Sequence, residues 1–243
     1  MREEISRAPC GASAARRAVF ETYAPVYPGL AQSELDVAVA HYDVSRLDAL
    51  NFSSCAVVGT SSSLMARARG AAIDAHSLVI RVNGYPLDPL REAWLGSRTD
   101  IAVLSFSRFV RPRNRTVAVF ACRWSGSCWS SARTDRVPRL SPRLVSDTRR
   151  RFGLTRWPST GLLAVTMAQH LCAHVSTFGF GINSSHSNCT HYYNVGPDGR
   201  CVLPKRVHFR NSRSRYDAYA GTHEHQHLVE ATLVHDVMPT ICS

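Results

Sequence analysis

The stretch that decides the fold is Cys55-Ala56-Val57-Val58-Gly59-Thr60-Ser61-Ser62-Ser63. Its apolar run, residues 56–58, predicts a short buried parallel strand that a glycine ends before a run of hydroxyl side chains. Residues 64–73 predict a helix, and residues 78–83 and 101–104 predict two further strands. Strand, small-residue turn, helix and strand together form half of a doubly wound nucleotide-binding fold.

The turn after the first strand has the chemistry of an anion site. Backbone N–H groups at a helix start favour phosphate oxygens, and the hydroxyls of Thr60 and Ser61 add hydrogen bonds. Asn83 ends the next strand, at the edge where open α/β sheets bind ligands. The chain nevertheless has neither a G-x-G-x-x-G motif nor a Walker lysine. On these residues alone, a nucleotide site and a purely structural turn both remain open.

The length of 243 residues suits one α/β domain with a short extension. We expect a helical extension or stem over residues 1–50, with helices over 14–23 and 33–50, and the α/β domain over 51–243. The net charge is +11, and nearly all the positive charge comes from arginine, because Lys205 is the only lysine. A basic surface suits an anionic small substrate, and no nucleic-acid-binding motif is present, so no nucleic acid is expected as a partner.

Eight cysteines without a C-x-x-C pair favour disulfides in a secretory compartment. N-x-S/T sequons indicate the same compartment and lie at Asn51, Asn114, Asn183 and Asn188. The sequence contains no signal peptide and no apolar run of about 20 residues. Either a membrane anchor lies outside this sequence, which would be the only membrane contact, or the compartment is a different one.

The second half of the chain continues the α/β pattern. We predict a strand over residues 116–121, a loop over 122–145 and a basic helix over 144–154. Next, Pro158-Ser159-Thr160-Gly161 predicts a helix start with hydroxyls near free N–H groups. A buried helix over 162–171 and a strand over 175–180 follow. The helix start is equally suited to simple capping and to binding an anion.

With these segments the sequence resembles the eukaryotic sialyltransferases, which share four short motifs. The matching residues, in the family's order, are Cys55–Gly59, Ile73–His76, Arg81–Asn83 and Gly96–Thr99 for the long motif, Pro158–Gly161, His170–Cys172 and Phe178–Gly181 for the short motif, His191–Asn194 for the third, and His225 with Glu230 for the last. The resemblance covers about residues 50–235. It implies a single Rossmann-like, GT-A-like α/β catalytic domain in the Golgi lumen that needs no metal or other cofactor.

The resemblance also implies roles for individual residues. His225 matches the general base and His191 the histidine that steadies the departing phosphate, while Glu230 would orient the base or cap local structure. The implied donor-binding residues are Thr60, Ser61, Asn83, Ser159, Thr160, Gly161, Phe180 and Gly181. Two positions depart from the family, since Thr60 stands where asparagine is frequent and Trp157 where tyrosine is frequent. A match displaced by two residues would make His223 or His227 the base.

The implied reaction is an inverting transfer of sialic acid from CMP-sialic acid to a glycan hydroxyl, expected to be a galactoside on a glycoprotein or glycolipid. The acceptor hydroxyl needs a base, and a histidine titrating near about 6.5 suits a mildly acidic lumen. The leaving phosphate, without a metal, needs N–H, hydroxyl and imidazole donors. Two alternatives are a different CMP-activated acidic sugar as donor, and a degenerate member that binds without turnover.

A zinc protease is the competing enzyme class, because residues 223–227 satisfy H-E-x-x-H. A third ligand is then needed, and the near candidates are Glu230 and His235. Glu230 lies seven residues after His223, or about 10 Å along a helix. Zinc ligands lie about 2 Å from the ion, so one ion cannot bind His223, His227 and Glu230 together. We therefore expect no metal site here.

The resemblance pairs Cys55 with Cys172. We also expect Cys189 and Cys201 to close a small loop around the third motif, and Cys10 and Cys242 to tie the termini. Cys122–Cys128 is left by elimination.

Overall fold

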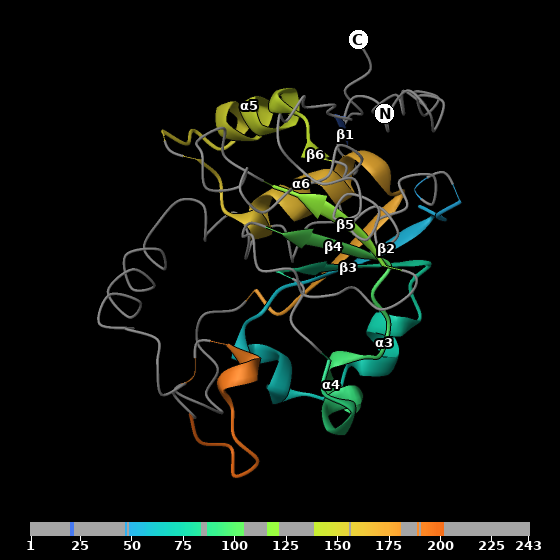
Figure 1. Cartoon of the computed structure of the whole chain (residues 1–243), viewed down its shortest axis with the longest axis vertical. Coiled ribbons are helices and arrows are strands. Elements are labelled where there is room, and N and C mark those ends of the chain that lie inside the picture. The colour runs from blue at the N-terminus through green and yellow to red at the C-terminus, as the bar shows by residue number, and fades with distance from the viewer. Residues whose placement is uncertain are drawn as a thin grey trace, which may run out of the picture.

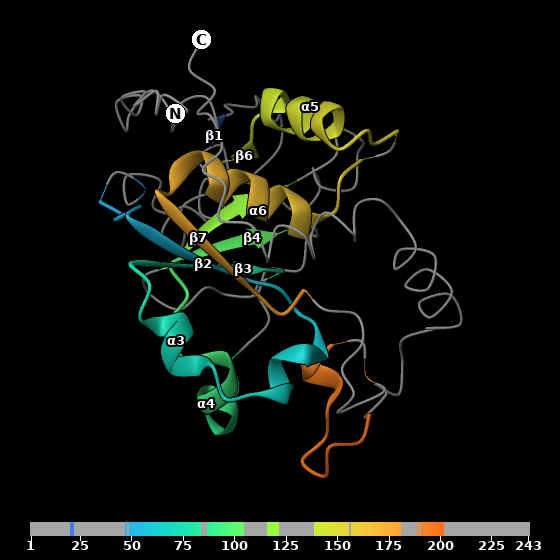
Figure 2. The same ribbon diagram turned by 180° about the vertical axis from the view of Figure 1, so that it is seen from behind.

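A computed structural model of the protein describes residues 20–21, 47, 49–83, 87–104, 116–121, 139–155, 157–180, 189 and 191–201. Over these ranges the chain forms one sheet with helices on both faces (Figures 1 and 2). This is the Rossmann-like α/β architecture that the sequence predicts. None of the helices in these ranges combines the length and the apolar composition needed to cross a bilayer.

Within the described ranges the sheet has seven strands in the order β1-β6-β5-β4-β3-β2-β7. Neighbouring strands are parallel, except that β1 pairs with β6 in the antiparallel direction. The strands are β1 Phe20–Glu21, β2 Ser54–Val58, β3 Leu78–Val82, β4 Ile101–Leu104, β5 Val117–Phe120, β6 Arg139–Leu140 and β7 His174–Phe178. The chain leaves β2 toward β3 on one side and returns to β7 on the other, so the strand order reverses at β2.

The helices form a layer on each face of the sheet (Figures 1 and 2). Helices α5 (Pro142–Arg151) and α6 (Thr160–Leu171) lie over one face, and α3 (Gly70–Asp74) and α4 (Glu92–Leu95) lie over the other. The described connections include the short 3₁₀ helices η2 (Ser62–Ala66), η3 (Pro89–Arg91) and η5 (Tyr192–Asn194).

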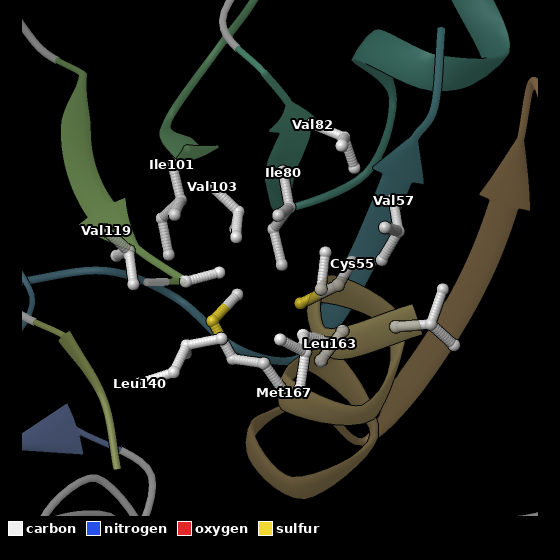
Figure 3. Close-up of a cluster of buried hydrophobic side chains, with 14 of the residues drawn as sticks. Cys55, Val57, Ile80, Val82, Ile101, Val103, Val119, Leu140, Leu163 and Met167 are labelled. Atoms are coloured by element: carbon white, nitrogen blue, oxygen red, sulfur yellow. The ribbon is translucent and has the colours of Figure 1, made fainter. Parts of the chain in front are cut away.

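The larger core lies between the sheet and α6, and Figure 3 shows its centre. Side chains of successive strands, among them Cys55, Val57, Ile80, Ile101 and Val103, meet Leu163 and Met167 of the helix there. The alternate side chains of β2 and β3 face a smaller cluster that contains Ala56, Val58, Ile73, Val79 and Leu95. Both faces of β2 are therefore buried, which explains why its sequence is apolar without alternation.

Most of the predicted elements are confirmed. The strands predicted over 78–83, 101–104, 116–121 and 175–180, and the helix over 162–171, form with bounds that differ by at most two residues.

The helix predicted over residues 64–73 is wrong in its middle. η2 ends at Ala66 and α3 begins only at Gly70, because Arg67 between them has an extended backbone with φ −146° and ψ 141°. Gly70 packs closely against α4, and a Cβ atom added to Gly70 would lie 2.0 Å from the Glu92 carbonyl oxygen. Close packing of α3 against α4 thus fixes where the helix restarts, and no periodicity in the sequence reveals that crossing.

Two short strands also correct the prediction. Phe20–Glu21 is β1 and not part of the helix predicted over 14–23, and Arg139–Leu140 is β6 and not part of the loop predicted over 122–145. The two strands pair with each other at one end of the sheet. Pairing between distant segments, which local propensity does not encode, decides both.

Helix α5 begins at Pro142, two residues before the predicted start at residue 144. The Ser141 hydroxyl accepts a hydrogen bond from the Leu144 N–H at 3.1 Å, and proline suits the first helical position. The helix predicted over 33–50 lies outside the described residues apart from 47, 49 and 50, and Leu47 is buried in the larger core. The domain boundary at residue 50 stays a prediction.

Candidate active site

The turns that follow β2 and β7 are bonded to each other at the carboxyl edge of the sheet. The Gly59 N–H donates to the Phe178 carbonyl at 2.8 Å, and the Ser61 N–H donates to the Gly179 carbonyl at 3.0 Å. This is the point where the strand order reverses, and open α/β sheets bind their ligands at such switch points. The first predicted turn and the segment before Gly181 therefore share one site.

Glycines make this close approach possible. A Cβ atom on Gly59 would lie 2.4 Å from the Gly179 carbonyl oxygen, which is backbone and has no rotamer to change. Gly179 has φ +73°, and a Cβ there would meet Leu64 at 2.6 Å. Both positions therefore need a residue without a side chain.

The hydroxyl groups of the first turn make different contacts. Ser61 is the N-cap of η2, and its hydroxyl accepts a hydrogen bond from the Ser63 N–H at 3.1 Å. The buried Ser62 hydroxyl donates to the Cys189 carbonyl. Thr60 instead faces the third motif, since its hydroxyl lies 3.1 Å from His191 Nδ1. The run of hydroxyls thus partly builds the site and partly lines it.

His191 is fixed against this turn by its backbone and by its ring. Ser61 and His191 form an antiparallel bridge, and the Tyr192 N–H donates to the Thr60 carbonyl at 3.0 Å. The imidazole stacks on Tyr193, with ring centroids 4.8 Å apart and planes inclined by 15°. Burial lowers the pKa of His191 below its ordinary value, while a hydrogen bond with the Thr60 backbone acts in the opposite direction. The neutral imidazole is therefore favoured.

The start of α6 lies beside these turns. The Ser159 hydroxyl caps the helix by accepting from the Leu162 N–H at 3.1 Å, which confirms the predicted helix start. A Cβ on Gly161 would lie 3.0 Å from the Phe180 ring, so this ring lies directly against the first turn of α6. Thr160, between Ser159 and Gly161, is the first residue of the helix.

Asn83 stands at the same edge, at the end of β3. It has φ +62°, a left-handed conformation that asparagine tolerates better than most residues, and its N–H donates to the Val103 carbonyl at 2.8 Å. It follows directly on Val82, the last residue of β3, so it lies one strand away from the turn of Thr60.

Another part of the long-motif match supports the fold. The Asp74 carboxylate accepts hydrogen bonds from the Ser97 and Arg98 N–H groups at 2.7 and 3.2 Å. Gly96, with φ +72°, leaves no room for a Cβ, which would lie 2.5 Å from Asp74 Oδ1. These residues tie the end of α3 to the segment between α4 and β4.

Two predicted disulfides are confirmed. Cys55 and Cys172 are joined with their Cα atoms 6.0 Å apart, and Cys189 and Cys201 with theirs 5.3 Å apart. The first bridge joins the beginning of β2 to the end of α6, so it lies at the opposite ends of these elements from the candidate site. The second closes the loop that carries His191.

The remaining predicted residues lie outside the described ranges. They are Gly181, His225 and Glu230, together with the cysteines of the other two proposed bridges, Cys10, Cys122, Cys128 and Cys242. Among the described residues, no group of histidine, cysteine, aspartate and glutamate side chains is arranged to hold a metal ion.

Sequence reasoning missed two contributors to the site. The buried Ser62 hydroxyl donates to the Cys189 carbonyl, a contact that the run of hydroxyl residues 60–63 does not reveal. Arg91 donates to the carbonyls of Tyr192 and Val195, more than a hundred residues later in the chain. Asp88-Pro89 is a visible helix-start signal before Arg91, but no local pattern shows what the arginine contacts.

The sheet order and the residues gathered at its switch point place the chain among doubly wound α/β proteins. Comparison with known proteins gives the family: residues 20–121 and 113–212 match the model of glycosyltransferase family 29 (sialyltransferase). The chain belongs to this family.

Individual relatives are distant. The chain is 27% identical over 177 residues to a CMP-N-acetylneuraminate-beta-galactosamide-alpha-2,3-sialyltransferase 1 of Sus scrofa, covering 63% of this chain and 51% of the relative. It is 28% identical over 199 residues to sialyltransferase-like protein 3 of Oryza sativa subsp. indica, covering 59% and 51%. The crystal structure of a mammalian sialyltransferase aligns with a TM-score of 0.49 at 21% identity, covering 91% of this chain and 80% of that one. The chain spans about half the length of the curated relatives it matches.

Proposed function

We propose that the protein is a sialyltransferase, which moves sialic acid from CMP-sialic acid to a hydroxyl of a glycan, with a galactoside as acceptor. Family membership supports this function. The observation that carries it is the convergence of Thr60, Ser61, Phe180 and His191 from separate segments onto the switch point of the sheet. An oxidising Golgi lumen as location is supported by the two disulfides.

For the donor side of the reaction we propose roles for residues that the structure describes. In the proposed complex the CMP phosphate binds at the turn of Thr60 and Ser61, beside the capped start of α6, and the nucleoside extends toward Asn83 and Phe180. In the tautomer that this role requires, His191 Nδ1 accepts from the Thr60 hydroxyl, and Nε2 carries the proton and donates a hydrogen bond to the departing phosphate. Trp157 packs against the larger core, so this departure from the family has a structural role.

On the acceptor side we propose His225 as general base and Glu230 as its partner. His225 takes the proton of the acceptor hydroxyl while the new bond to the anomeric carbon forms. The bond from that carbon to the phosphate oxygen breaks, and CMP leaves with the electron pair. One displacement inverts the anomeric configuration and needs no metal.

The test is a transfer assay with purified protein, CMP-sialic acid and a panel of galactosides, which measures CMP release and product linkage. We expect transfer that a chelator does not reduce. If CMP is released only from a different CMP-linked acidic sugar, that sugar is the donor. If the protein binds CMP-sialic acid but releases no CMP, it is a binding protein. Bound zinc with loss of activity in chelator would contradict the metal-free mechanism.

The base is tested by three alanine variants of neighbouring histidines. We expect His225→Ala to lower the transfer rate about 10²–10⁴-fold, the usual contribution of a general base, with little change in CMP affinity. His223→Ala and His227→Ala are matched controls and should retain most of the rate. A large loss in one of these controls instead would move the base to that position.

A further inference from the structure

Arg91 forms a fork across η5, the short helix that follows His191. It is the last residue of η3, and its Nη1 donates to the Tyr192 carbonyl at 2.6 Å while its Nη2 donates to the Val195 carbonyl. These carbonyls belong to the first residue of η5 and to the residue after its end. One guanidinium therefore contacts both ends of the helix.

The guanidinium is itself held in place. Arg91 Nε lies 3.3 Å from Asp88 Oδ2, and the other oxygen of that carboxylate caps η3 by accepting from the Leu90 N–H at 3.0 Å. The Arg91 side chain is only 17% exposed. Hydrogen bonds from a charged, mostly buried donor are stronger than those between neutral groups.

η5 has few hydrogen bonds of its own. Its described backbone bonds run from the Asn194 N–H to the His191 carbonyl and from the Val195 N–H to the Tyr192 carbonyl, each at 3.1 Å. A three-residue 3₁₀ helix has poor hydrogen-bond geometry and depends on its surroundings. Thr60 and Ser61 fix the end at which His191 stands, and Arg91 reaches the far end as well as the first helical residue.

From this geometry we propose that Arg91 is a positioning residue for His191: its fork on the Tyr192 and Val195 carbonyls keeps the imidazole against Thr60 at the carboxyl edge of the sheet. The catalytic consequence rests on the proposed function, because it requires His191 to act on the leaving phosphate. The planar guanidinium matters as much as its charge, since a lysine offers a point charge without a fork of fixed geometry.

The kinetic test compares Arg91→Lys and Arg91→Ala in the wild-type and His191→Ala backgrounds. A misplacement of about 1 Å can cost about 10²-fold in rate, so we expect kcat to fall roughly 10–100-fold in the wild-type background with a small change in donor KM. In the His191→Ala background the same substitutions should cost less than about threefold, because their target is already absent. Equal losses of kcat in both backgrounds, or no loss of kcat in a folded Arg91 variant of the wild-type background, would overturn the proposal.

Arg150→Ala is the matched control. Arg150 also pairs with an aspartate three residues earlier, Asp147 at 2.7 Å, but its side chain is 82% exposed and lies on α5. This variant should keep the wild-type kcat. A loss as large as that of Arg91→Lys would overturn the proposal, because it would show that kcat responds to surface charge in general.

A second measurement does not depend on turnover. In an NMR titration, the His191 resonance is assigned by its absence in His191→Ala, and we expect its pKa to rise toward the ordinary histidine value in Arg91→Lys, as the ring leaves its buried position. The lysine keeps the positive charge, so loss of charge does not explain a rise. An unchanged titration would refute the positioning role. If the pKa of His191 rises as expected but the wild-type protein turns over no CMP-sugar, the proposed function is refuted while the positioning role of Arg91 stands.

Discussion

Substituting Gly59 with alanine should separate the two turns that build the candidate site. Gly59 is buried, and its new Cβ would lie 2.4 Å from the Gly179 carbonyl oxygen, where real contacts essentially never fall below 3.0 Å. The turns must therefore move apart by about 0.6 Å, the difference between these distances. The hydrogen bond from Gly59 to Phe178, now 2.8 Å, and that from Ser61 to Gly179, now 3.0 Å, would lengthen accordingly.

The cost follows from these contacts. Overpacking in a well-packed region costs about 1–3 kcal/mol. Two weakened backbone hydrogen bonds add about 0.5–1.5 kcal/mol each. The free energy of unfolding should therefore fall by roughly 2–6 kcal/mol, which at about 3 °C per kcal/mol for a chain of this size lowers the melting temperature by about 6–18 °C.

Thermal and urea unfolding of Gly59→Ala measure this loss, and Gly161→Ala is the graded control. At Gly161 the Cβ would meet the Phe180 ring at 3.0 Å, and a ring can shift while a backbone carbonyl cannot. Alanine also favours the helix, so we expect a change within about 1 kcal/mol there. If Gly59→Ala unfolds at the wild-type midpoint, the bonded pair of turns does not exist as described.

Three further predictions concern stability and modification. Replacing both Cys55 and Cys172 by alanine opens a link across a sequence separation of 117, which the chain-entropy model values at about 5 kcal/mol, and denaturant unfolding should show most of that loss. Burial lowers the pKa of His170, whose Nδ1 has no hydrogen-bond partner among the described residues, so the unfolded chain binds a proton more readily than the folded one. Stability should then be intact above about pH 6.5 and fall below it by up to about 1.4 kcal/mol per pH unit; urea midpoints of His170→Gln should depend less on pH over that range, and an equal dependence would contradict the assignment. Asn51 is an exposed sequon residue whose Oδ1 accepts from the Ser53 N–H at 3.0 Å, at the beginning of the sheet and away from the candidate site. In protein secreted from eukaryotic cells, a glycosidase that removes N-glycans should shift the gel mobility of the wild type by one glycan more than that of Asn51→Gln.

The parts of the fold that the sequence predicts are those with strong local signals. Residues 101–104 form a buried strand because every side chain there is apolar, and α6 begins where Ser159 caps it. The motif resemblance adds the pairing of Cys55 with Cys172, which no local pattern contains. Short-range physics and the family pattern therefore agree over the centre of the sheet.

The errors arise where distant segments decide. β1 and β6 have two residues each, too few for any periodicity, and exist through their mutual pairing. The break before Gly70 depends on the approach of α4, a helix later in the chain. Within the candidate site, Thr60 and His191 were both predicted but their contact was not, because 131 residues separate them.

The two described disulfides act on the candidate site in different ways. Cys55–Cys172 joins β2 to α6 at the ends remote from the site, and α6, twelve residues or about 18 Å long, carries that constraint to Ser159 at its other end. Cys189–Cys201 instead closes a loop of sequence separation 12 directly around His191, with a chain-entropy value of about 3 kcal/mol. The long bridge therefore stabilises β2 and α6, whose other ends lie at the candidate site. The short bridge, together with Ser62 and Arg91, acts on the segment that carries His191.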